Sequence, residues 1–297
     1  MSRFHLLFLP IVLTAASAAT VIGHDGRAVA VDRPARIVAL NPATVEILAD
    51  LGEAGCIVGT DTATHAVMPG ATEQGVINFG HPYHPNVEAI VAARPDLVIG
   101  TADSLSDSTP EQLRSAGLAV LVLESSTQDG VEGLKRRIAV VASAFDKTIE
   151  GRAMVARIDA RLAALDAANA KVSPRKSVFF LYTHGPGGKT DIYGRDTGAH
   201  WLIELAGGHN AADFTTGIKP LTAEALVQAS PDALILLDRS IASMGGIDAI
   251  YTIAGVGLTP AGRNRAVTPV DNNIRWIGSH FLDHVEALHR ALYAAAP

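Results

Sequence analysis

Cysteine is almost absent from the sequence, since Cys56 is the one cysteine among 297 residues. A single cysteine cannot form an internal disulfide, and this one stands too far along the chain to carry the lipid of a lipoprotein. Between Gly55 and Ile57 it is expected to be a small buried hydrophobe. A hydrophobic core must therefore stabilise the chain, and its 48% of hydrophobic residues can supply one.

Positive charge is also scarce, with 24 Lys and Arg residues against 30 Asp and Glu residues and a net charge of −6 at pH 7. Proteins that hold a phosphate backbone need a basic surface. No block of like charges in the sequence provides one, so a nucleic-acid partner is not expected.

Long hydrophobic runs are missing after the N-terminus. There, Arg3 precedes an apolar stretch, Leu6–Leu13, and small residues follow up to Ala18 and Ala19. This order is typical of a secretory signal peptide, so we expect residues 1–19 to be removed by cleavage near Ala18 or Ala19. No later window approaches the roughly 20 apolar residues of a membrane span. The mature chain is expected to be soluble and periplasmic.

The common local signatures of hydrolases are absent. The sequence has no G-x-S-x-G elbow and no H-E-x-x-H helix. Ser279, His280 and Asp283 are too close in sequence to form a triad, because triads are assembled across a fold. An exported hydrolase is kept only as a remote alternative, and no enzyme activity is expected.

One stretch, Gly188-Lys189-Thr190, resembles the end of a nucleotide phosphate loop, G-x-x-x-x-G-K-[ST]. Thr183, however, occupies the position of the first glycine, and the residues after Thr190 do not begin a helix. We therefore expect a glycine-rich turn after a buried strand, and no nucleotide site.

Short β-branched runs alternate with helical patterns along the chain, which is typical of parallel sheets. The first set of runs is Arg36–Leu40, Ile57–Asp61, Asp96–Gly100 and Val120–Glu124, and the second is Ser177–Tyr182, Ala233–Asp238 and Ala266–Val270. Two Rossmann-like α/β lobes with central parallel sheets are therefore predicted.

A helical segment separates the two sets. No glycine or proline interrupts Arg152–Val172, so one long helix is expected to bridge the lobes and to end at Ser173-Pro174. The predicted organisation is a signal peptide (1–19), an N-terminal lobe (20–146), a bridging helix (147–172) and a C-terminal lobe (173–297).

The sequence also contains an internal echo. "NVEAIVAARPDLVIG" at Asn86–Gly100 and "TAEALVQASPDALIL" at Thr222–Leu236 match in Glu, Ala, Pro and Asp at identical spacing. Each predicts a short helix that ends before proline and leads through Asp into a buried strand. Two lobes of similar construction imply a ligand cleft between them.

Four further motifs, in this order, resemble the periplasmic solute-binding proteins of ABC importers for iron chelates, hemes and cobalamin, and most of all the hemin-binding branch. These are Gly194–Thr197 ("GRDT"), Leu205–Gly208 ("LAGG"), Lys219–Glu224 ("KPLTAE") and Thr259–Arg263 ("TPAGR"). The resemblance covers nearly all of the mature chain. It implies two lobes bridged by a rigid helix, a monomer, and an inner-membrane permease and ATPase complex as partner.

The resemblance also assigns roles to two glutamates and marks two departures. One docking glutamate on each lobe, here Glu88 and Glu224, would pair with arginines of the permease. Where hemin-binding members present an iron-ligating tyrosine, this chain has His65, and imidazole can also ligate iron. Where they carry a basic C-terminal loop whose arginine can meet a propionate, this chain reads "IGSHFLDH" and has His280.

Among the side chains that can ligate heme iron or a metal ion, histidine is well represented, with 11 histidines against five tyrosines. Five of them stand at expected strand ends or cleft loops, namely His65, His81, His84, His184 and His280. We expect His65 and His184 to be the metal or heme-iron ligands. Tyr83 is expected to be a ligand or a stacking surface, and Arg195 an anion partner or a partner of Asp191 or Asp196.

The function expected from these residues is capture of heme, or a related iron chelate, in the cleft and its delivery to the permease. The alternative is a binding protein for a transition-metal ion or small metal chelate held directly by the histidine cluster. A long rigid bridge favours a largely preformed cleft over wide hinge closure.

Overall fold

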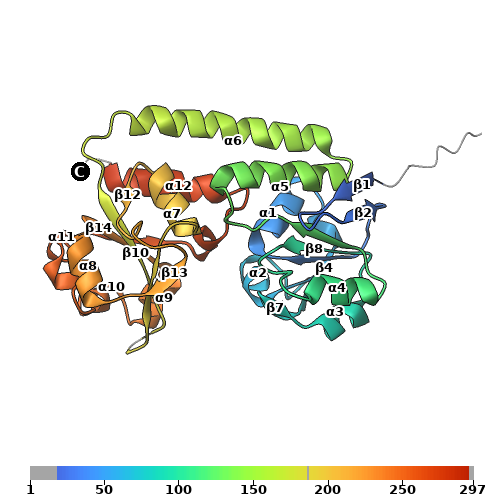
Figure 1. Cartoon of the computed structure of the whole chain (residues 1–297), viewed down its shortest axis with the longest axis horizontal. Helices are drawn as coiled ribbons and strands as arrows, with labels where there is room; N and C mark the ends of the chain where they lie inside the picture. The colour runs from blue at the N-terminus through green and yellow to red at the C-terminus, as the bar shows by residue number, and fades with distance from the viewer. Residues whose placement is uncertain (1–18, 186, 294–297) are drawn as a thin grey trace, which may run out of the picture.

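Two α/β lobes lie beneath one long helix, α6 (Thr148–Asn169) (Figure 1). The computed structural model describes residues 19–185 and 187–293. The expected signal peptide therefore lies outside the described residues, except for Ala19, which begins β1. Each lobe has its own sheet, which confirms the expected fold of two lobes and a bridging helix. The boundaries given above for the lobes and the bridge remain predictions.

The N-terminal lobe has a five-stranded sheet in which every neighbouring pair is parallel. In spatial order its strands are β5 (Ile77–Asn78), β4 (Ile57–Thr60), β3 (Ile37–Leu40), β8 (Leu97–Thr101) and β9 (Val120–Leu123). Two antiparallel hairpins are β1 (Ala19–Ile22) with β2 (Ala28–Val31), and β6 (Gly80–His81) with β7 (His84–Pro85). The four longer strands of the sheet fall on the four apolar runs expected from the sequence.

Helices connect these strands, as parallel pairing requires. They are α1 (Pro42–Asp50), α2 (Thr62–Val67), α3 (Val87–Ala93), α4 (Thr109–Ser115) and α5 (Gly130–Ala144), with a 3₁₀ turn at Ala54–Cys56. Cys56 is partly buried at the edge of the core rather than enclosed in it.

The C-terminal lobe has a six-stranded sheet that is only partly parallel. Its main path is β13 (Ile218–Pro220), β11 (Thr190–Tyr193), β10 (Ser177–Thr183), β14 (Ala233–Leu237) and β15 (Val267–Val270), while β12 (His209–Asn210) pairs with β10. The strands expected from the sequence, β10, β14 and β15, are parallel. Of the added strands, β11 pairs antiparallel with β10 because a tight turn, not a helix, joins them. β13 pairs antiparallel with β11 after a longer connection that contains α7 and β12.

That turn is the glycine-rich stretch that resembled a phosphate loop. The main-chain amide of Gly188 donates to Gly185 O at 3.0 Å, and that of His184 to Lys189 O at 3.1 Å. The turn lies between two strands, whereas a phosphate loop opens a helix. The helices of this lobe are α7 (Gly198–Leu205), α8 (Ala223–Ala229), α9 (Asp238–Ser243), α10 (Ile247–Ile250), α11 (Pro260–Arg263) and α12 (Phe281–Tyr293), with 3₁₀ turns at Val256–Leu258 and Asn272–Arg275.

The internal echo has a structural counterpart in both lobes. Each short helix ends in a left-handed residue, Arg94 (φ 48°) after α3 and Ser230 (φ 46°) after α8. The aspartate that follows then accepts a hydrogen bond from the neighbouring central strand. Asp96 Oδ2 accepts from Arg36 N at 2.9 Å, and Asp232 Oδ2 accepts from Ser177 N at 2.9 Å. The repeated Pro-Asp therefore fixes the register of β8 on β3 and of β14 on β10.

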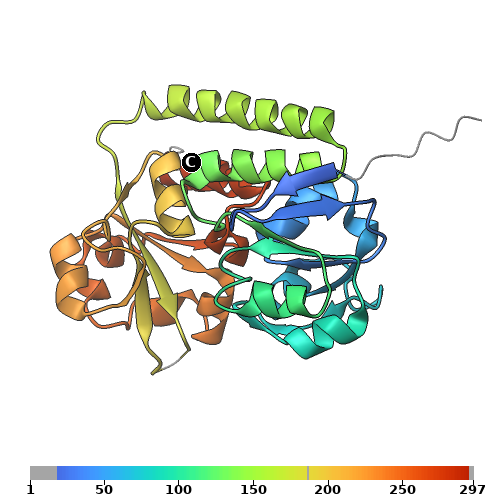
Figure 2. The same ribbon diagram turned by 45° about the vertical axis from the view of Figure 1, so that its right-hand side comes forward.

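The bridging helix contacts both lobes (Figure 2). Toward α5 it presents Gly151, where an added Cβ would lie 2.4 Å from Ala142 Cβ. Toward α12 it presents Arg161, which donates to Glu286 at 2.8 Å and to Asp283 at 2.6 Å. At about 1.5 Å per residue the helix is long enough, roughly 33 Å, to span both lobes. No helix in the described part of the chain is long and apolar enough to cross a membrane.

Candidate functional site

A cleft of about 200 Å³ lies between the lobes and is lined by both. The N-terminal lobe contributes Tyr83, Asp103, Ser126 and Thr127. The C-terminal lobe contributes Tyr193, Asp196, Thr197, Gly198, Gly217, Ile218, Arg275 and Trp276. Part of this lining follows the carboxyl ends of strands β8, β9 and β15, which is the usual position of ligands in open α/β sheets.

Tyr182, at the end of β10, does not line the cleft itself but packs against two residues of its C-terminal wall, Arg275 and Tyr193. Arg239 Nη2 donates to the Tyr182 hydroxyl oxygen at 2.7 Å, and its guanidinium carbon lies 5.3 Å from the ring centroid. On the same ring, the guanidinium carbon of Arg275 lies 5.6 Å from the centroid. Arg275 is also 4.8 Å from the Trp276 ring. Two guanidinium groups are therefore oriented by aromatic faces at the edge of the cleft.

Tyr193 completes this wall. Its ring packs edge-on against Phe180, with centroids 4.6 Å apart, and lies 6.1 Å from the Tyr182 ring. Burial raises the pKa of the Tyr193 hydroxyl, although the nearby Arg275 opposes the shift. We refer to Tyr182, Tyr193, Arg239, Arg275 and Trp276 as the tyrosine–arginine wall.

The N-terminal wall is more acidic and is held by main-chain contacts. Asp103 Oδ2 accepts from Ser126 N at 3.0 Å and from Ser126 Oγ at 2.6 Å. Tyr83 lies in the loop between β6 and β7, where its carbonyl accepts from Ser106 Oγ at 3.3 Å. The N-terminal wall thus carries the carboxylate of Asp103, whereas the C-terminal wall carries the carboxylate of Asp196 together with the guanidinium of Arg275.

The histidines expected to converge on the cleft do not form one cluster. Within residues 19–185 and 187–293, no group of three or more His, Cys, Asp or Glu side chains could hold a metal ion. His81 and His84 lie together on one hairpin, and the other three histidines lie in separate places.

His65 is turned toward its own lobe. Its Nε2 lies 3.1 Å from Val76 O, so this nitrogen is occupied by a carbonyl, and His65 is not part of the cleft lining. His81 and His84 are exposed on the β6–β7 hairpin, with rings stacked at 5.4 Å and 18°. They flank Tyr83, whose amide donates to His81 Nδ1 at 3.2 Å. They therefore stand at the rim of the cleft rather than inside it.

His184 lies beside the tyrosine–arginine wall. Its Nε2 is 2.9 Å from Asp191 Oδ2 across the β10–β11 hairpin, and its ring packs edge-on against Tyr182 at 4.7 Å. Arg195 is exposed, and its Nη2 is 3.5 Å from Thr216 Oγ1. Asp191, one of the two acids expected to pair with Arg195, is instead the partner of His184.

His280 connects the lobes outside the cleft. Its main-chain amide donates to Glu46 Oε2 at 3.1 Å, and its Nε2 lies 3.4 Å from Asp50 Oδ1, both on α1. The hydrogen bond to Asp50 raises the pKa of His280 to about 9 and lowers that of Asp50. Burial raises the pKa of Glu46. This histidine is committed to an interlobe contact, which is a different role from the one expected.

Replacing His280 with Ala should lower the free energy of unfolding by about 1 kcal/mol at pH 6, a value reduced for solvent screening of a half-exposed ring. Because the folded-state pKa is raised above the ordinary 6.5, the protonated ring stabilises the fold fully below pH 6.5, and this contribution is lost as the pH rises through 9. Urea unfolding of both proteins at pH 6 and pH 10 measures the effect. An equal difference at the two pH values would contradict the assignment, and His209→Ala is the control.

Glu88 and Glu224 are both exposed and occupy the first turns of α3 and α8. Their helices are capped alike, since Asn86 Oδ1 accepts from Ala89 N and Thr222 Oγ1 accepts from Ala225 N. The two carboxylates therefore occupy equivalent positions on the two lobes. Their docking role remains a prediction.

Sequence reasoning missed most of the tyrosine–arginine wall. Tyr182 and Arg239 are 57 residues apart, and no local pattern links them. One usable signal was that Arg275-Trp276 follows the last strand of the sheet, at the edge where the cleft lies. Tyr193 also directly precedes the "GRDT" motif, so it stands at a strand end.

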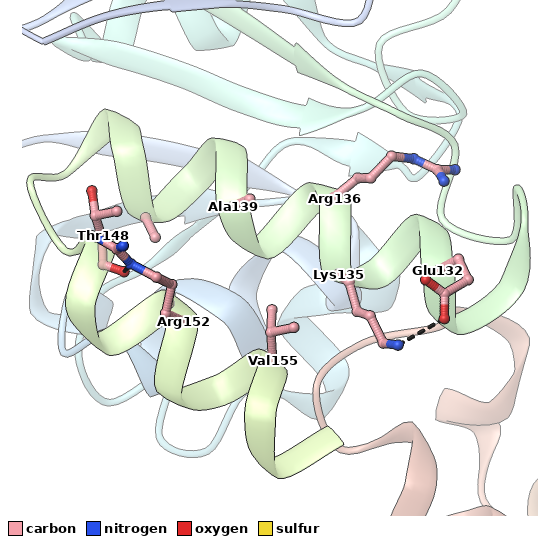
Figure 3. A pocket seen from close by; sticks show the side chains of 9 residues that line it. Glu132, Lys135, Arg136, Ala139, Thr148, Arg152 and Val155 are labelled. Carbon is pink, nitrogen blue, oxygen red and sulfur yellow. Dashed lines mark hydrogen bonds and ion pairs between the residues drawn. The ribbon is translucent and has the colours of Figure 1, made fainter. Parts of the chain in front are cut away.

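A larger hollow, of about 380 Å³, lies between α5 and α6 (Figure 3). It is lined by aliphatic stems and by charged side chains such as the partly buried Lys135, which donates to the exposed Glu132 at 2.7 Å. All its lining residues lie between 132 and 155, so it does not join the two lobes. The smaller cleft, which does, is the better candidate site.

Two α/β lobes joined by one long helix, with a ligand cleft between them, define a binding protein of the two-lobe type. Residues 37–273 match the Periplasmic binding protein family, and the chain belongs to this family.

Individual relatives are consistent with this membership. The chain is 31% identical over 210 residues to a cobalamin-binding protein of Halobacterium salinarum, covering 68% of this chain and 53% of the relative. It thus spans about half the length of that relative. It is 27% identical over 267 residues to the ABC transporter substrate-binding lipoprotein YvrC of Bacillus subtilis, covering 88% and 80%. The periplasmic heme-binding protein RhuT from Roseiflexus sp. RS-1 has a TM-score of 0.80 at 31% identity, covering 88% of this chain and 99% of that one.

Proposed function

We propose that this protein is the periplasmic substrate-binding component of an ABC importer and that it captures heme in the interlobe cleft. The observation that carries the proposal is the tyrosine–arginine wall. Ferric heme iron accepts a tyrosine oxygen as axial ligand, and heme carboxylates suit the planar guanidinium fork. The heme-binding structural relative supports the same ligand class.

Within this group, Tyr182 is the proposed axial ligand; it lies beside the lining residues Arg275 and Tyr193, so the iron would reach it at the edge of the cleft. Arg239 donates to its hydroxyl oxygen, which orients that oxygen and leaves a lone pair free for iron. Arg275, which lines the cleft, is the proposed partner of a heme carboxylate. Tyr83, on the opposite wall, would stack on or ligate the second face, with His81 and His84 beside it. The ring of His184 packs edge-on against that of Tyr182 and would help to hold it in place.

The size of the cleft bears on how the ligand would lie. At about 200 Å³ it is smaller than the roughly 300–1,000 Å³ typical of drug-sized ligands. The porphyrin would therefore enter edge-on and leave part of one edge outside the cleft. Alternatively, the two lobes would move slightly apart to admit it. The exposed apolar side chain of Ile218, which lines the cleft, would cover part of the edge left outside.

The remaining parts of the proposal concern partners and location. An inner-membrane permease with its ATPase would receive the ligand, and the protein would act as a monomer in the periplasm after removal of residues 1–19. The ABC transporter relative supports the first point. Mass spectrometry of the exported chain tests the second through the position of cleavage.

Titration of residues 20–297 with hemin tests the ligand directly. Wild type should give a saturable shift of the heme absorption band, and Tyr182→Phe should change the band and weaken binding by about tenfold or more, because a charge-assisted or metal contact is typically worth about 1.5–3 kcal/mol. His65→Ala and His184→Ala test the two histidines singled out by sequence, and His209→Ala serves as the distant control. Saturable uptake of cyanocobalamin or zinc, with no hemin shift, would contradict the heme proposal.

A further inference from the structure

The most deeply buried basic side chain in the described part of the chain lies directly behind the cleft. Arg137, in the middle of α5, is 1% exposed. Its guanidinium donates to three main-chain carbonyls, namely Ser125 O at 2.8 Å, Ser126 O at 3.1 Å and Ile277 O at 2.6 Å. The first two belong to the loop between β9 and α5 of the N-terminal lobe. The third belongs to the C-terminal lobe, so one side chain contacts both lobes at once.

These carbonyls are the neighbours of cleft residues. Ser126 lines the cleft and holds Asp103 through its amide and its hydroxyl. Ile277 directly follows Arg275 and Trp276, which form part of the opposite wall. In addition, Ile277 N donates to Ser126 O at 3.3 Å. Arg137 therefore contacts the main chain of Ser126, which lines the N-terminal wall, and of Ile277, which is next to Trp276 of the C-terminal wall.

The chemistry of this contact favours a geometric role over a stabilising one. No carboxylate is among the hydrogen-bond partners of Arg137, and burial lowers its pKa to about 10, although Glu124 and Asp103 act in the opposite direction. A buried cation without a paired anion costs desolvation energy that an apolar side chain of similar size would avoid. The planar guanidinium, however, has donors pointing in several fixed directions, which a lysine ammonium lacks.

We propose that Arg137 is a positioning residue that fixes the distance and angle between the two walls of the cleft. It touches no ligand itself. Its effect on binding rests on the proposed function, since it acts by holding Asp103 and Ser126 against Arg275 and Trp276. Its effect on lobe geometry does not depend on any ligand.

Spin labels on the two lobes test the geometric effect without ligand. In a Cys56→Ser background, the pair Ala92→Cys on α3 and Val227→Cys on α8 places labels at exposed positions of each lobe. Distances from pulsed electron resonance should give a narrow distribution for wild type, a broader one for Arg137→Lys and the broadest for Arg137→Met. Arg152→Met, which removes an exposed arginine on α6 whose hydrogen bond stays within its own helix, is the control and should resemble wild type.

Distributions as narrow as wild type in both variants would overturn the proposal. If Arg137→Met does not fold, Arg137→Lys decides by the same criterion. Hemin titration of the same proteins is the second arm, in which Arg137→Met should bind about tenfold or more weakly while retaining the wild-type absorption band, as expected from loss of preorganisation. If wild type fails to bind hemin, the proposed function fails, whereas the distance measurement still tests Arg137.

Discussion

Replacing Arg275 with Ala is expected to weaken hemin binding by about 10- to 100-fold, which corresponds to the roughly 1.5–3 kcal/mol of a charge-assisted hydrogen bond. Arg275 lines the cleft, and the rings of Tyr182 and Trp276 hold its guanidinium in place. A heme carboxylate that binds beside Arg275 would meet guanidinium N–H donors that are already oriented. The Arg275 side chain would therefore lose little conformational entropy on binding.

The ligand itself supplies the sharpest control for this prediction. Hemin dimethyl ester lacks the carboxylates, so wild type and Arg275→Ala should bind it with nearly equal affinity. The hemin affinity of Arg275→Lys should lie between those of wild type and Arg275→Ala, because an ammonium keeps the positive charge but cannot donate two parallel hydrogen bonds to a carboxylate. Arg290→Ala, an exposed arginine on α12, should leave both affinities unchanged. Equal losses for hemin and its ester would show that Arg275 supports the wall and does not pair with a carboxylate.

Replacing Glu88 and Glu224 together with Ala is expected to abolish delivery to the membrane while leaving hemin binding intact. The two carboxylates occupy equivalent first turns on the two lobes and are exposed, well placed to meet arginines of a permease. If each contact is worth about 1.5–3 kcal/mol, the double replacement should weaken docking by roughly 10²- to 10⁴-fold, and each single replacement by roughly 10- to 100-fold.

Growth of the source organism on hemin as its iron supply, with the variant replacing the native copy, measures delivery. The matched control is Glu73→Ala with Glu150→Ala, which removes two exposed carboxylates from other parts of the surface. Loss of growth in this control would point to net charge rather than to specific docking. Normal growth of the Glu88 and Glu224 double variant would rule out the docking role.

Much of the fold could be predicted because its signals are local. Each buried strand is a short β-branched run, and the Pro-Asp of the echo marks the same contact in both lobes, through Asp96 and Asp232. The antiparallel strands β11 and β13 were not predicted, since β11 depends on a tight glycine turn whose direction the sequence does not state and β13 reaches β11 only through a long connection that contains α7.

The site was harder to predict because its residues meet only after folding. Histidine was expected to dominate the cleft, yet His65 contacts Val76 O within its own lobe and His280 is held by α1. A histidine at a strand end can turn toward either side, and the nearest free carbonyl or carboxylate decides which. Arg239 and Arg275 reach Tyr182 from different strand ends, so only the sheet order brings them together.

In the proposed role as the binding component of an ABC importer, the bridging helix α6, which contacts α5 through Gly151 and α12 through Arg161, would influence the rate of uptake. A two-lobe protein whose lobes move little presents almost the same docking surface to the permease with and without bound ligand. Unloaded copies would then compete with loaded ones for the importer, and the uptake rate would follow the fraction of occupied copies rather than their total number. Raising expression without raising the supply of ligand would slow import.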